Sequence, residues 1–135
     1  MIYLDTSALA KLVVRESETA KLTTWLQDHD DQAWATSIVG HVELGRLAAR
    51  HGVPAQAVQL LDGVDTIPLD SRVAAIAAAA GPATLRTLDA IHLASAMLVR
   101  AELTALVAYD HRLLAAVQTV GLPTCSPGFA TSPGR

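Results

Sequence analysis

Cysteine is nearly absent from this 135-residue chain, in which Cys125 is the only example. A single thiol excludes an internal disulfide framework and a cysteine-based zinc site, so we expect a reducing compartment. Long apolar runs are missing as well, because none approaches the ~18 residues of a membrane span. Asp5 interrupts the N-terminus before the apolar part of a signal peptide could form. The sequence therefore predicts a cytoplasmic protein without a membrane segment.

Aromatic and basic residues are also scarce. The chain has two Trp, two Tyr and one Phe, whereas 51% of its residues are hydrophobic, mostly alanine and leucine. This composition favours helices that pack closely through small side chains, and the length suits one domain. Ten Lys and Arg against 13 Asp and Glu give a net charge of -3, which counts against a non-specific nucleic-acid binder. The net charge does not decide the matter, because a divalent cation held by several acidic residues would cancel part of it locally.

Short apolar segments alternate with helical ones along the chain. We expect strands at residues 2–4, 32–36, 64–69, 104–109 and 122–125, and helices at 7–14, 19–29, 38–51, 54–61, 72–80, 88–100 and 111–120. Pro68 favours an edge position for its strand, and the expected helix N-caps include Ser17, Ser37 and Asp70. This alternation predicts an α/β fold, with a parallel sheet that helices cover on both faces.

Four acidic residues occupy positions that such a sheet could bring together. Asp5 and Asp110 each end a strand and precede a helix, so both lie at the same edge of a parallel sheet. Glu43 is the only acid in the helix that follows the second strand, and Asp89 begins the most apolar helix. Each also has an ordinary explanation when taken alone. The three aspartates suit helix N-termini, and Glu43 could form a solvated ion-pair face with the arginines three and seven residues later.

As a set, the four acidic residues predict a cation site. Unit charges ~4 Å apart repel by about 4 kcal/mol at an effective dielectric constant of 20, so such a cluster needs a cation or protons. Oxygen ligands without histidine or cysteine favour Mg²⁺ or Mn²⁺. These ions activate water and stabilise a phosphoryl transition state, so phosphodiester hydrolysis is the reaction that the site would serve best.

Four motifs carry a resemblance to a known family. They are IYLDTSAL at residues 2–9, Ser37 followed by ELGR at 43–46, TLDAIHLA at 87–94 and VAYDHRL at 107–113. By these motifs, in their order and spacing, residues 1–125 resemble the PIN domain, and within it the VapC-type ribonuclease toxins of bacterial toxin–antitoxin pairs. The chain departs from the family pattern at Ala108, where a hydroxyl residue is common.

The resemblance implies a fold, a site and partners. Residues 1–125 would form a three-layer PIN-like nuclease domain with a short central parallel sheet of four to five strands. The composition of residues 126–135, rich in Pro, Gly and Ser, separately predicts a loose tail. The implied activity is Mg²⁺-dependent endoribonuclease activity, with Mn²⁺ able to substitute. The implied partners are an RNA substrate, a small VapB-type antitoxin that covers the acidic site, and a second copy of the chain. The implied catalytic and metal-binding set is Asp5, Glu43, Asp89 and Asp110, assisted by Thr6 or Ser7.

The roles of other polar residues stay open at this stage. Arg46, Arg86 and Arg112 could hold phosphates, although ordinary surface pairing explains each of them equally well. Structural or surface roles are expected for His92 and His111, because neither has a second histidine four residues away, as a metal motif would require. A module that binds metal or RNA at the acidic pocket without catalysis also fits the same residues.

Overall fold

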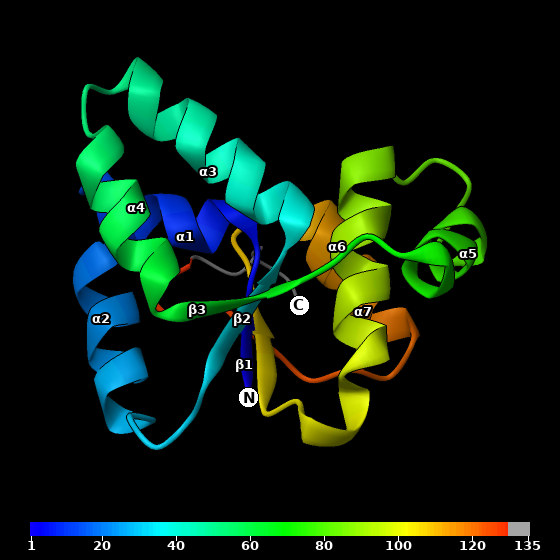
Figure 1. Ribbon diagram of the computed structural model, residues 1–135. Coiled ribbons are helices and arrows are strands. Elements are labelled where there is room, and N and C mark those ends of the chain that lie inside the picture. Colours follow the sequence, from blue (N-terminus) through cyan, green and yellow to red (C-terminus); the bar gives the residue numbers. More distant parts are fainter. Residues whose placement is uncertain (130–135) are drawn as a thin grey trace.

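A sheet of five parallel strands forms the centre of the structure, a computed structural model that describes residues 1–129 (Figure 1). The strands are β1 (Ile2–Leu4), β2 (Trp34–Ser37), β3 (Val64–Ile67), β4 (Ala105–Val107) and β5 (Thr124–Cys125). They pair in the order β3-β2-β1-β4-β5, and every neighbouring pair is parallel. The predicted α/β class is therefore confirmed, and β3 lies at an edge of the sheet, as Pro68 indicated.

Helices cover both faces of the sheet and give the molecule three layers (Figure 1). One layer contains α1 (Thr6–Val13), α2 (Thr19–Asp28), α3 (Ile38–Arg50) and α4 (Pro54–Asp62), and the other contains α5 (Ser71–Ala79), α6 (Thr87–Leu98) and α7 (His111–Thr119). A short 3₁₀ helix, η1 (Arg100–Glu102), follows α6. Across residues 1–129, no helix has both the length and the apolar character that crossing a membrane requires.

Strand β1 is completely buried, because it lies in the middle of the sheet and between the two helical layers. Its side chains alternate between the two faces, as they do in any strand. Ile2 and Leu4 join the apolar cluster under α1 to α4, whereas Tyr3 joins the cluster under α5 to α7. The residue that follows β1, Asp5, therefore leaves the sheet at its centre.

The strand expected at residues 104–109 is shorter in the structure. Only Ala105–Val107 belong to β4. Beyond them the backbone turns toward α7, and the Tyr109 amide donates a hydrogen bond to Ser7 Oγ (2.8 Å) rather than to a neighbouring strand. This side-chain contact ends β4 and ties the start of α7 to the start of α1.

The expected helix caps are found at Ser37 and Asp70 but not at Ser17. Ser37 Oγ accepts from an amide in the first turn of α3, and the Asp70 carboxylate does the same for α5. The N-cap of α2 is Glu18, and it makes no side-chain capping bond. Ser17 precedes this position, and its hydroxyl donates to Glu18 Oε2 (2.7 Å).

The first four residues of the expected loose tail pack against the domain. Ser126 Oγ donates to the Ala108 carbonyl (2.7 Å), and Tyr109 Oη donates to the Pro127 carbonyl (2.7 Å). The Phe129 ring lies edge-on against Tyr109, with 5.4 Å between ring centroids. Residues 130–135 of the expected tail lie outside the described residues.

Helix α3 approaches β2 and α6 closely at Gly40. A Cβ atom at this position would lie 2.3 Å from Thr36 Oγ1 and 3.2 Å from His92 Cε1. Both neighbours are buried, so neither can move without disturbing the core. Gly45, one turn later in the same helix, has no atom within 4 Å of the corresponding position.

We predict that Gly40→Ala lowers the free energy of unfolding by about 1–3 kcal/mol, because the added methyl group overpacks the junction of α3 with β2. Gly45→Ala is the matched control. It should raise stability by about 0.5–1 kcal/mol, the usual gain when alanine replaces glycine in an exposed helix. Urea unfolding of the two variants and the parent protein measures both effects, and equal stability of the two variants would contradict this packing.

Candidate active site

The carboxylate of Asp5 stands at the C-terminal end of β1 and caps α1. Its Oδ1 accepts hydrogen bonds from the Ala8 amide (2.9 Å) and from Ser7 Oγ (2.7 Å). The residue is only 4% exposed. Burial raises the pKa of Asp5 to about 6, and the charge of Asp110 adds to the rise, whereas His92 and the two hydrogen bonds oppose it. Because burial destabilises the charged form of Asp5, a positive charge nearby would stabilise the carboxylate.

Asp110 and Asp89 share one arginine. Asp110 caps α7 through Oδ1, which accepts from the amides of Arg112 and Leu113. Its Oδ2 lies 3.1 Å from a guanidinium nitrogen of Arg86, and the same nitrogen lies 2.9 Å from Asp89 Oδ2. Asp89 itself is in the first turn of α6. The two aspartates are thus held together by a positive charge.

Glu43 points toward the start of α1 rather than along its own helix. Its Oε1 accepts a hydrogen bond from Thr6 Oγ1 (2.5 Å) and lies 3.3 Å from His92 Nε2. In the described residues, no ion pair joins Glu43 to Arg46 or Arg50, so the alternative of a solvated ion-pair face is wrong. The hydrogen bond with His92 is the largest cause of a lowered pKa for Glu43, with a smaller contribution from Thr6.

A buried histidine, His92, joins Glu43 and Thr6 to Tyr3 in the core. The sequence analysis did not predict this role. His92 is 2% exposed. Its Nδ1 lies 2.7 Å from Tyr3 Oη, and its Nε2 lies 3.1 Å from Thr6 Oγ1. The available signal was its position three residues after Asp89, which places both side chains on one face of α6.

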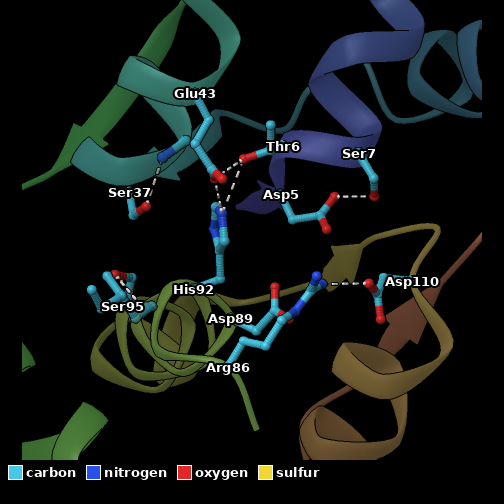
Figure 2. A network of polar contacts seen from close by, with 12 residues as sticks. Asp5, Thr6, Ser7, Ser37, Glu43, Arg86, Asp89, His92, Ser95 and Asp110 are labelled. Atoms are coloured by element: carbon cyan, nitrogen blue, oxygen red, sulfur yellow. Dashed lines mark hydrogen bonds and ion pairs between the residues drawn. The ribbon is translucent and has the colours of Figure 1, made fainter. Parts of the chain in front are cut away.

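The four carboxylates surround one region at the carboxyl edge of the sheet (Figure 2). They come from four different places in the chain: Asp5 after β1, Glu43 in α3, Asp89 in α6 and Asp110 before α7. Among residues 1–129, no three His, Cys, Asp or Glu side chains lie close enough together to share one metal ion. The charged group that bridges two of the acids is instead the guanidinium of Arg86. Because the side chains of all four acids offer carboxylate oxygens, they would suit a hard divalent cation.

The three arginines considered from the sequence lie in different places. Arg86 and Arg112 line a groove of about 490 Å³ between the start of α6 and α7, and Asp89 lines it too. Arg46 lies with Arg50 on a separate surface of α3. The structure therefore places two of the arginines beside the carboxylates, where they could contact an anionic substrate.

Comparisons with known proteins agree with the fold. A family model described as PIN domain matches residues 2–118. The chain belongs to the PIN-domain family.

Relatives within this family are named as ribonucleases. Ribonuclease VapC47 of Mycobacterium tuberculosis is 54% identical, over 95% of this chain and 98% of that protein. Ribonuclease VapC35 of the same organism is 42% identical, over 96% of this chain and 99% of that protein. These matches confirm the family and the ribonuclease class expected from the sequence.

A solved structure shares the fold at low sequence identity. It is described as a toxin-antitoxin complex from Klebsiella pneumoniae and is 20% identical, with a TM-score of 0.71 over 96% of this chain and all (100%) of that one. The likeness shows that a chain with low sequence identity has the same fold.

We predict that Arg86→Gln strengthens the binding of Mn²⁺ about two- to five-fold. The guanidinium competes with any cation for Asp89 and Asp110, and an exposed ion pair of this kind is only weakly held. Isothermal titration of the protein with Mn²⁺ in the absence of RNA measures the change. Arg112→Gln is the matched control, because its side chain lines the same groove without an ion pair to either aspartate in the described residues. Weaker Mn²⁺ binding by Arg86→Gln would show that Arg86 does not compete with the cation.

Proposed function

We propose that this chain is a Mg²⁺-dependent endoribonuclease, with Mn²⁺ able to substitute. Asp5, Glu43, Asp89 and Asp110 are the proposed catalytic and metal-binding set. The observation that carries the proposal is the placement of these four carboxylates around one edge of the sheet, with the Asp5 carboxylate buried there. Such a concentration of negative charge needs a cation or protons, because like charges at close range destabilise one another.

In the proposed reaction, hydroxyl side chains position the carboxylates and arginine side chains bind the RNA. When bound, the ion supplies activation of the attacking water and charge stabilisation at the phosphoryl group. Thr6 and Ser7 hold the Glu43 and Asp5 carboxylates in place through their hydroxyl groups. Arg86 and Arg112 bind the phosphates of the RNA strand in the adjoining groove. Arg86 neutralises Asp89 and Asp110 in the resting site, and its guanidinium would be free to contact the RNA if a divalent ion offset the charge of those two carboxylates.

We also propose that the nuclease is the toxin of a type II toxin–antitoxin pair and acts in the cytoplasm. Support comes from the VapC relatives, which are named as ribonucleases, and from the structural neighbour described as a toxin-antitoxin complex. The partners in this proposal are a small VapB-type antitoxin and a second copy of the chain. Antitoxin binding over the acidic site would block both the ion and the RNA.

We predict that Asp5→Asn and Asp89→Asn each lower the rate of RNA cleavage by at least about 100-fold while the protein stays folded. Asparagine keeps the size of the side chain and can still cap a helix, but it removes the charge that holds the ion. Cleavage of a labelled RNA with Mg²⁺, and again with excess EDTA, measures the effect, and EDTA should abolish the activity of the parent protein.

The control for this series is Asp70→Asn. Asp70 caps α5 as Asp5 caps α1, yet its polar contacts are with Arg72 and the first turn of its own helix, so the change should leave cleavage unchanged. Parent-like cleavage by Asp5→Asn and Asp89→Asn would reject the site. A parent protein that binds the ion and RNA but never cuts would instead favour a catalytically silent binding module.

We predict that induced expression of the chain stops bacterial growth and that co-expression of the small reading frame adjacent to its gene restores it. The Asp5→Asn variant should leave growth unaffected, because toxicity depends on cleavage. Growth curves and mapping of new RNA ends after induction test this. Normal growth with soluble parent protein present would reject the toxin role without affecting the nuclease assignment.

A further inference from the structure

The histidine beneath the carboxylates occupies an unusual position. His92 lies in the stretch Ala90–Ala96, in which every residue of α6 is buried and its immediate neighbours are Ile91 and Leu93. A polar ring in such a place is costly unless its nitrogens are hydrogen-bonded. Both ring nitrogens have partners, so the ring is fixed from two sides.

The directions of the hydrogen bonds follow from the donors available. The Ser37 amide donates to Tyr3 Oη (3.1 Å), which leaves the phenolic proton for His92 Nδ1 at 2.7 Å. Burial holds the pKa of Tyr3 above its usual range, so the phenol keeps this proton. With Nδ1 accepting from the phenol, the donor nitrogen of the ring is Nε2, which faces Glu43 Oε1 and Thr6 Oγ1 (Figure 2).

As a result, one oxygen of the Glu43 carboxylate, Oε1, makes all of the contacts of that carboxylate with other side chains in the described residues. Both contacts of the carboxylate, from Thr6 and from His92, are made to Oε1. Within the described part of the chain, Oε2 has no hydrogen-bond partner. Partners of this kind orient metal ligands in many proteins, and their loss typically costs 10- to 100-fold in metal affinity or activity.

We propose that His92 is a positioning residue for Glu43: with Tyr3 behind it, it ties Glu43 Oε1 to the protein and leaves Oε2 for the divalent cation. The inference rests on the proposed function, because it assigns Glu43 to the ion. The backbone at the junction of β2 and α3 is the fixed end of the chain of hydrogen bonds, through the Ser37 amide. The Glu43 side chain is 33% exposed. Its hydrogen bond to the buried His92 therefore fixes it relative to the sheet.

The test is the affinity of the protein for Mn²⁺, measured by calorimetric titration without RNA. His92→Leu keeps an apolar packing volume but removes the donor, and we expect Mn²⁺ to bind about 10- to 100-fold more weakly. His92→Gln retains an amide donor and should recover part of the loss. His51→Gln, at an exposed histidine that follows α3, is the matched control and should bind as the parent protein does.

Tyr3→Phe tests the same series of hydrogen bonds and leaves Glu43, Thr6 and His92 themselves unchanged. It keeps the ring in the core, so the protein should fold, and it removes only the hydroxyl that orients His92. We expect about 3- to 10-fold weaker Mn²⁺ binding. This variant keeps the proposal testable even if His92→Leu fails to fold.

A double-mutant comparison separates positioning from simple packing. If His92 acts through Glu43, Glu43→Gln and Glu43→Gln/His92→Gln should bind Mn²⁺ equally weakly, because the second change removes nothing further. A purely structural histidine would instead lower thermal stability and leave Mn²⁺ affinity intact in the folded variants. If His92→Leu and Tyr3→Phe both bind Mn²⁺ with affinities within two-fold of the parent, the role of His92 is overturned but the proposed metal site is not. A parent protein that binds no Mn²⁺ would overturn the proposed metal site as well.

Discussion

Parallel pairing around β1 is the constraint on which the remainder of the structure depends. Because all five strands run in the same direction, their carboxyl ends and the helices that follow them meet at one edge. Asp5 and Asp110 arrive there as helix caps, with Oδ1 of each accepting backbone amides. Capping uses one oxygen of each carboxylate and leaves the second directed at the site. The ordinary role of these residues and the proposed catalytic role are therefore compatible, and the capping bonds fix the carboxylates in place.

Repulsion between the carboxylates opposes this geometry, and Arg86 offsets part of the repulsion. Its guanidinium bridges Asp89 and Asp110, but its side chain is 65% exposed, so solvent and salt weaken both ion pairs. Asp5 lies deeper and has no ion pair with an arginine or lysine in residues 1–129. Burial of an unneutralised carboxylate raises its pKa, as is found for Asp5. One weakly held arginine and one buried acid at the same site support the proposal that a divalent ion binds there.

Much of the fold could be predicted from local patterns, whereas the contacts inside the site could not. Most strands and helices have a periodicity or a cap that the sequence displays, and the positions of Asp5 after β1 and of Asp110 before α7 follow from that order. Glu43 and Asp89 needed the family motifs, because a helix position alone does not say which way a side chain faces.

The contacts that escaped prediction join residues far apart in the chain. Tyr3 and His92 meet across 89 positions, and the apolar surroundings of His92 resemble an ordinary core helix. The choice of Arg86 over Arg46 depends on where a loop and a helix face point in three dimensions. In the same way, Ser126 and Pro127 pack onto residues of the β4–α7 connection, a tertiary contact that a Pro, Gly and Ser composition does not reveal.

The junction of β2 with α3 shows that stability and site geometry compete for the same residues. Gly40 weakens the helix but lets it approach Thr36 and His92 closely. Thr36 Oγ1 is buried there without a hydrogen-bond partner in the described residues, an arrangement that costs free energy. His92 adds two ring nitrogens to the core, and both need hydrogen-bond partners there. These unfavourable features are concentrated where the backbone must hold Glu43, which is the pattern expected when a core is shaped by the site above it.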